Sequence, residues 1–228
     1  MRTSIRSGLT ALVVALALSV SACGRVENPI GPSPPVPPAA DNGWSKLSAE
    51  AQTFLLVSNI NAVGRGGVTK WMENPRVYAE GLDVAGQSAV GGFWRDVTGG
   101  GVNLQFVSSP LSEAEHGINL RKGTEGLEPY PGACGLGGVR ERRGNVIYRG
   151  HGVLAYFLLP DCMRFDATAI AVGYAHEIGH ALGFQEHFPV PRVDVLSVPS
   201  PLEFVSTPVF REAVTWLYSS SVRPGWKP

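Results

Sequence analysis

The sequence predicts an α+β domain in which several strands and a few long helices share one core. Residues 102–107 alternate strictly between apolar and polar side chains, which is the pattern of a half-buried strand. Residues 167–175 are small and apolar throughout, as expected of a buried helix. Residues 208–219 carry apolar side chains at helical spacing and predict a last helix. Separate runs of strands and helices of this kind indicate the α+β class.

The remaining elements follow from the same periodicities, interrupted by glycine and proline. Ser45 is placed to cap a first helix that ends near Gly64, and Asp166 is placed to cap the apolar helix. The charged run 140–143 predicts a solvated turn. No internal repeat is visible. The expected order is a helix over 45–64, a strand over 68–80 interrupted by Asn74 and Pro75, a helix over 87–97, strands over 102–107, 117–121, 145–148 and 153–159, a helix from 166, and a helix over 208–219.

The N-terminal segment has the features of an export signal. Arg2 and Arg6 precede a short apolar run that ends in Val-Ser-Ala-Cys at Cys23, and the run is too short to span a membrane. It resembles a bacterial lipoprotein signal, which implies cleavage after residue 22 and acylation of Cys23. A plain signal peptide with an incidental cysteine is the alternative. The acylated form predicts an exported lipoprotein, periplasmic or at the cell surface, that contacts the membrane through its lipid anchor.

The mature chain is expected to have a tether and one domain. Residues 23–43 are rich in proline and predict an extended spacer. Residues 44–228 suit a single domain with a sizeable core. Loss of Arg2 and Arg6 with the signal leaves two more acidic than basic residues, and no basic run is interleaved with aromatic side chains. This composition argues against a nucleic-acid partner. We expect a monomer.

The most informative motif lies at the end of the apolar helix. His176, Glu177 and His180 form the pattern H-E-x-x-H, followed by Gly183. An α-helix turns about 100° per residue, so the two histidines share one face and can bind one zinc ion. Glu177 can reach a water at that ion without binding the metal. Gly183 suits a left-handed position that ends the helix. The residues themselves therefore predict a zinc hydrolase site.

With this motif, the order of elements resembles the metzincin clan, and matrixin-like metalloproteases in particular. The resemblance covers most of residues 68–219, with support from Thr69-Lys70-Trp71 and Trp216-Leu217-Tyr218. It implies a mixed, mainly parallel twisted sheet, an active-site helix that carries H-E-x-x-H, and a C-terminal helix. It also implies that an edge strand runs antiparallel to the bound peptide, and we assign that role to residues 153–159.

The third zinc ligand departs from the clan's pattern. That pattern places a histidine three residues after the glycine, at the position of Glu186, whereas this chain has His187 one residue later. We expect His187 to bind, because a loop after Gly183 can accommodate an extra residue. The carboxylate of Glu186 is the alternative ligand. A more distant carboxylate, Glu203, has no convincing helical context.

A second departure concerns the methionine that lies beneath the metal in this clan. Residues 194–199 resemble that turn, with Leu196 in the methionine position. Leucine and methionine have similar volumes and usually interchange at a cost below about 1.5 kcal/mol. Leu196 can therefore fill the space beneath the metal as methionine does. The substitution is also consistent with a degenerate, inactive site. Two further histidines, His116 and His151, do not match the spacing of a structural metal site and are interpreted as ordinary loop or strand residues.

Cys134 and Cys162 remain once Cys23 is assigned to lipid. An even pair in an exported protein predicts a disulfide. The alternative is that Cys134 binds zinc as an inhibitory thiolate.

These observations predict a zinc-dependent endopeptidase that acts on protein or peptide substrates with one catalytic Zn²⁺. The expected ligands are His176, His180 and His187, and Glu177 is the expected general base and acid. The competing hypothesis is a non-catalytic, degenerate metzincin-fold lipoprotein used for binding. A zinc amidase or cell-wall hydrolase is a third hypothesis.

Overall fold

The computed structural model describes residues 42–62, 66–129, 133–156, 158, 162, 166–187, 195–196 and 203–228. They belong to one compact unit, Ala39–Pro228. The expected signal peptide over 1–22, Cys23 and most of the linker over 23–43 lie outside the described residues. Within the described part of the chain, no helix is both long and apolar enough to cross a bilayer.

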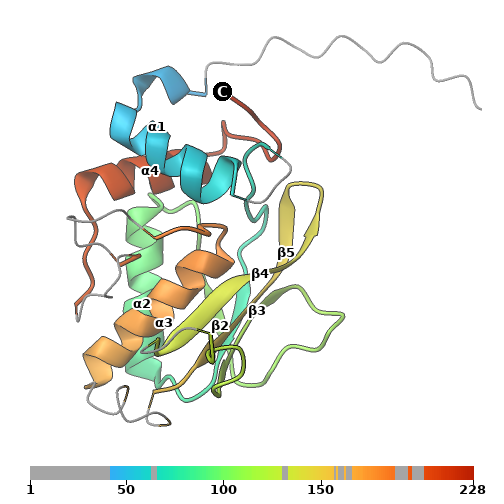
Figure 1. Cartoon of the computed structure of the whole chain (residues 1–228), viewed down its shortest axis with the longest axis vertical. Coiled ribbons are helices and arrows are strands. Elements are labelled where there is room, and N and C mark those ends of the chain that lie inside the picture. Colours follow the sequence, from blue (N-terminus) through green and yellow to red (C-terminus); the bar gives the residue numbers. More distant parts are fainter. Residues whose placement is uncertain are drawn as a thin grey trace, which may run out of the picture. The chain divides into compact units, whose positions relative to one another are not determined.

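A five-stranded sheet forms one layer of the domain (Figure 1). Its strands are β1 (Arg76–Ala79), β2 (Gln105–Val107), β3 (Gly117–Lys122), β4 (Gly135–Arg143) and β5 (Val146–Leu154), in the order β2-β1-β3-β5-β4. The neighbours β2-β1, β1-β3 and β3-β5 are parallel, and β4 is antiparallel to β5. The sheet is therefore mixed and mostly parallel, which confirms the α+β class.

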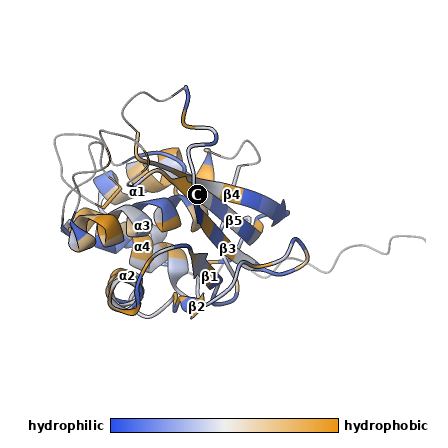
Figure 2. Cartoon of the chain, turned by 90° about the horizontal axis from the view of Figure 1, so that it is seen from below, coloured by the Kyte–Doolittle hydropathy of each residue, from blue (hydrophilic) through white to orange (hydrophobic). Residues whose placement is uncertain are grey.

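The β4–β5 hairpin corrects three expectations. The run 140–143, expected as a solvated turn, is the end of β4. The sheet is largely hydrophilic along β4 and β5 (Figure 2). The expected strands 145–148 and 153–159 are one strand, β5, which ends at Leu154. Gly150 and Gly152 break its apolar pattern, yet they are needed there: a β-carbon at Gly150 would lie 2.6 Å from the Ala181 side chain. Because β5 lies between β3 and β4, the edge role expected for residues 153–159 is wrong, and β4 forms that edge.

The helices lie on one side of the sheet (Figures 1 and 2). They are a 3₁₀ turn η1 (Trp44–Lys46), α1 (Ala49–Leu55), a π-helical turn η2 (Leu56–Ile60), α2 (Val84–Val97), α3 (Ala167–Ala181) and α4 (Pro208–Tyr218). Side chains of Ser48, Asp83, Asp166 and Thr207 cap the four α-helices by accepting a main-chain N–H. Ser45, the expected first cap, lies in η1 instead.

Helix α3 is held by hydrogen bonds from three other parts of the core. Trp94 on α2 donates its indole N–H to the Ala175 carbonyl (3.1 Å). Trp71 donates in the same way to Ala181 (2.9 Å). The Tyr218 hydroxyl on α4 donates to the Leu182 carbonyl just beyond the helix (2.6 Å). All three donors are buried, so α3 has little freedom to shift along its axis.

Candidate metal centre

Three histidine side chains converge at the C-terminal half of α3. The Nε2 atoms of His176 and His180 lie 3.1 Å apart, and Nε2 of His187 lies 3.2 Å from that of His176. The ligand atoms of all three residues lie within 4.8 Å of one another. Gly183, with φ of +108°, ends the helix and turns the chain so that His187 returns to the pair. The group could hold one metal ion.

Hydrogen bonds to main-chain carbonyls orient two of the rings. Nδ1 of His176 donates to the Val195 carbonyl (2.8 Å), and Nδ1 of His180 donates to the Phe184 carbonyl (2.6 Å). A carbonyl only accepts, so each Nδ1 carries the proton and each Nε2 presents a lone pair to the shared space. The Nε2 atoms of His176 and His180 lie 3.1 Å apart. At this distance their lone pairs repel one another unless both bind a cation.

Burial keeps these imidazoles neutral. It lowers the pKa of His176 to about 3 and that of His180 to about 4, and it also lowers the pKa of the more exposed His187. Neighbouring imidazoles also lower the pKa values of His176 and His180, whereas the charge of Glu186 partly offsets the effect of burial on His187. Neutral imidazole is the form that binds a metal ion, so the site is ready for one at neutral pH.

The structure brings His187, and not Glu186, to the histidine pair. Glu186 is exposed and is outside the cluster. Glu203 is also exposed and outside it. His116 packs edge-on against the Tyr148 ring, and His151 lies in β5 with a pKa lowered by burial. Neither belongs to a metal-binding group among the described residues.

Glu177 is buried beside the histidines and packs against the edge strand. Only 6% of the residue is exposed, and its Oε2 has no hydrogen-bond partner among the described residues. Burial raises the pKa of this carboxyl to about 8. A metal dication nearby would act in the opposite direction and favour the carboxylate. The side chain lies over Gly135 and Gly137 of β4, where any β-carbon would collide with it. The Glu177 carboxyl is thus held between the start of the edge strand and the helix that carries His176 and His180.

Tyr156 is a nearby residue that the sequence did not single out. It follows β5, is buried, and places its hydroxyl against Gly173, one helical turn before Glu177. Burial and then the charge of Glu177 raise the pKa of the phenol, which stays protonated at neutral pH. Its only sequence signal is its position after an apolar strand, which many core tyrosines share.

Leu196 packs against α3 between His176 and His180 in sequence, at Gly179. It is fully buried, and a β-carbon at Gly179 would lie 2.6 Å from its Cδ2. The preceding residue, Val195, supplies the carbonyl that accepts the His176 proton. This two-residue segment both packs against the helix and orients the His176 ring.

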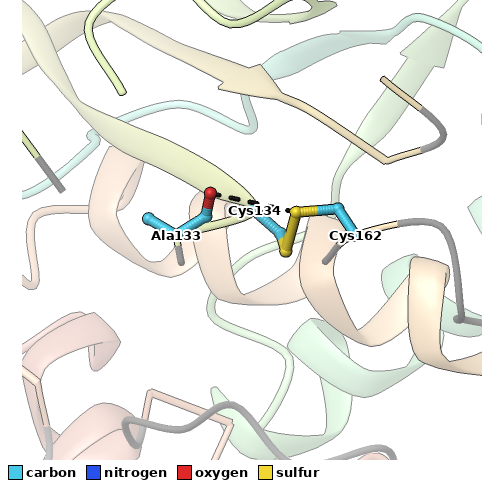
Figure 3. Close-up of a disulfide and its surroundings, with 3 residues drawn as sticks. All are labelled: Ala133, Cys134 and Cys162. Atoms are coloured by element: carbon cyan, nitrogen blue, oxygen red, sulfur yellow. Dashed lines mark hydrogen bonds between the residues drawn. A yellow bond between two sulfur atoms is a disulfide. The ribbon is translucent and has the colours of Figure 1, made fainter. Parts of the chain in front are cut away.

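Cys134 and Cys162 form a disulfide with an S–S distance of 2.07 Å and a Cα–Cα distance of 5.6 Å (Figure 3). Both sulfurs are engaged in this bond, so Cys134 has no thiolate to offer a metal. Cys134 directly precedes Gly135, the first residue of β4. The bond therefore ties the start of the edge strand to the chain that leads into α3.

No protein-family model matches this chain, and no curated protein is significantly similar to it in sequence.

Proposed function

We propose that the chain is a zinc-dependent endopeptidase, exported and attached to a membrane through acylated Cys23. The observation that carries this proposal is the convergence of three histidine Nε2 atoms beside a buried glutamate that has an unpartnered oxygen. A purely structural metal site has no use for an unligated carboxylate at its border. The resemblance to matrixin-like metzincins points to the same chemistry.

The spacing of the histidines suits zinc. Nitrogens bound to one tetrahedral zinc at about 2.0–2.1 Å are separated by roughly 3.3–3.4 Å. The two Nε2 separations of 3.1 and 3.2 Å are close to that value. Three neutral imidazoles leave the ion its full positive charge and a fourth position for substrate or water. His176, His180 and His187 are the proposed ligands, and Glu186 is not needed.

When bound, zinc supplies a Lewis acid that polarises a peptide carbonyl and acidifies a water. Glu177 accepts a proton from the water that attacks the carbonyl and delivers it to the leaving amine. The unpartnered Oε2 is available for that proton, because no described side chain or main-chain group competes for it. The Val195 and Phe184 carbonyls hold the two imidazoles in the tautomer that this chemistry requires.

The edge strand supports a peptide as the substrate. In the part of the chain that the structure describes, β4 pairs with β5 alone, so no described strand occupies its other edge, where an extended peptide would add a further strand to the sheet. The start of that strand lies against Glu177. A peptide added antiparallel to β4 would run past the proposed catalytic carboxylate.

Substitution of Glu177 tests the proposal. We expect Glu177→Gln to bind one zinc per chain, as the wild type does, and to lose casein cleavage by at least about 100-fold, since general acid–base catalysis contributes 10²–10⁴-fold. Glu186→Gln is the matched control and should retain both properties. Retained cleavage by Glu177→Gln would sink the catalytic role.

A binding lipoprotein is the second candidate, favoured by Leu196 in the position where the clan has methionine. That protein would bind zinc in stoichiometric amounts and cleave neither casein nor a mixed peptide library. Cleavage that is lost with Glu177→Gln would exclude it.

A further inference from the structure

Asn59 is a fully buried polar residue that joins two distant segments. Its Oδ1 accepts from the Thr69 N–H (3.0 Å), and its Nδ2 donates to the Thr69 carbonyl (2.7 Å) and to the Gly183 carbonyl (3.0 Å). Both hydrogens of the amide are therefore used. Asn59 lies in the π-helical turn η2, a form of helix that is frequent at functional sites.

The two residues after Gly183 are held by the same N-terminal helical segment. The Gln185 N–H donates to the Ser58 carbonyl (2.7 Å). The Phe184 ring stacks on Phe54 of α1, with ring centres 5.7 Å apart and planes at 10°. Residues 183, 184 and 185 thus each have a partner within residues 54–59.

Residues 183–185 determine how two of the three histidines are placed. The Phe184 carbonyl accepts the Nδ1 proton of His180 and so fixes the ring whose Nε2 faces the cluster. His187 follows Gln185 by two residues, so the direction of the chain at Gln185 sets where that imidazole arrives. A shift of Gly183 away from Asn59 would move both groups.

We propose that Asn59 is a positioning residue of the metal centre: by holding the Gly183 carbonyl it fixes the Gly183–Gln185 segment that orients His180 and delivers His187. This inference rests on the proposed metal-binding function. Asn59 touches neither metal nor substrate and acts only through that segment. Loss of a group that hydrogen-bonds directly to a metal ligand, as the Phe184 carbonyl does to His180, typically changes metal affinity by about 10- to 100-fold. Asn59 holds that carbonyl in place through Gly183.

The chain offers a matched control for Asn59. Asn119 on β3 makes the same double hydrogen bond to one main-chain residue, accepting from the Leu111 N–H (2.9 Å) and donating to the Leu111 carbonyl (2.8 Å). It lies far from the histidines in sequence and contacts none of them through these bonds. Asn59→Leu and Asn119→Leu therefore each remove a side-chain amide that makes two hydrogen bonds to one main-chain residue. Only Asn59→Leu also removes a hydrogen bond to the Gly183–Gln185 segment.

The test measures metal binding without using activity. Zinc affinity is obtained by competition with a chromophoric chelator, and the coordination geometry is monitored by the visible absorption of the protein loaded with Co²⁺. We expect Asn59→Leu to lower zinc affinity by about 10- to 100-fold and to alter the Co²⁺ spectrum. Asn119→Leu should keep the affinity and the spectrum of the wild type, even where urea denaturation shows that it is less stable.

Phe54→Leu keeps the inference falsifiable if Asn59→Leu does not fold. This variant retains an apolar side chain, loses the stack on Phe184, and should also weaken zinc binding and alter the Co²⁺ spectrum. If folded Asn59→Leu protein keeps the wild-type zinc affinity and Co²⁺ spectrum, the role of this segment is overturned while the proposed function stands. Phe54→Leu provides the same test if Asn59→Leu does not fold. A wild type that binds neither zinc nor Co²⁺ would overturn the proposed function and this inference with it.

Discussion

Gly137 of β4 and Glu177 of α3 are packed so closely that no side chain fits at position 137. A β-carbon there would lie 2.5 Å from the Glu177 main-chain oxygen and 2.8 Å from its Oε2. The edge strand and the proposed catalytic carboxylate therefore constrain each other directly. The strand proposed to pair with a peptide, β4, therefore also packs against the proposed proton acceptor, Glu177.

We predict that Gly137→Ala displaces β4 or the Glu177 side chain and lowers kcat/KM for casein-derived peptides. A displacement of about 1 Å at a reacting group can cost about 100-fold in rate. Zinc content should stay near one per chain, because the proposed ligands His176, His180 and His187 lie in α3 and in the chain after it, and none lies in β4. Gly138→Ala is the control in the same strand: its β-carbon would lie 3.8 Å from His151, an ordinary contact. Equal activity in the two variants would contradict the account.

The disulfide is predicted to stabilise the fold and the start of the edge strand. It closes a loop between residues 28 positions apart, and removing such a bond costs about 3–4 kcal/mol in the chain-entropy description. Cys134→Ala combined with Cys162→Ala should lower the free energy of unfolding in urea by about that amount. Because Cys134 precedes Gly135, the double variant should also lose activity below its unfolding transition. An unchanged urea midpoint would show that the bond contributes little.

The pH dependence of stability is expected to have a maximum near pH 6.5 in protein stripped of metal. Burial lowers the pKa of His176 and His180 from 6.5 to about 3 and about 4, so below pH 6.5 the unfolded chain binds up to two more protons at these residues. Burial raises the pKa of Glu177 from 4.5 to about 8, so from pH 4.5 to 8 the folded chain binds one more proton there.

The two effects have opposite signs. Between pH 4.5 and 6.5 the histidines prevail, and stability rises with pH; between pH 6.5 and 8 only Glu177 contributes, and stability falls. Urea unfolding after chelator treatment, measured at half-unit steps from pH 4.5 to 8, checks this profile. In His176→Leu/His180→Leu protein the rise below pH 6.5 should become smaller, and what remains comes from His187 and His151, whose pKa values burial also lowers. A rise of unchanged size in that variant would assign it to other groups.

The helices were largely predictable because their signals are local. Asp166 caps α3, Thr207 and Pro208 begin α4, and the H-E-x-x-H spacing places His176 and His180 on one face without knowledge of the fold. Strand β4 was missed because its first half is glycine-rich and its second half is charged. Gly135 and Gly137 are explained only by Glu177, about 40 residues away, whose backbone and side chain occupy the space that a β-carbon would need.

The surroundings of the site were less predictable than its ligands. The hydrogen bond from Asn59 to Gly183 joins residues 124 positions apart, and an asparagine near the end of a helix has no pattern that reveals such a partner. The choice between His187 and Glu186 depended on the path of the chain after Gly183, which its φ of +108° and the contacts of the N-terminal helical segment determine. Tyr156 likewise reaches the neighbourhood of Glu177 only through tertiary packing.

The most direct test of the central claim is the zinc content of the purified protein, measured by elemental analysis for the wild type, His187→Ala and Glu186→Ala. The three-histidine site predicts one zinc per wild-type chain, loss of that zinc in His187→Ala and its retention in Glu186→Ala. Zinc that is retained in His187→Ala and lost in Glu186→Ala, or a wild type without zinc, would contradict it.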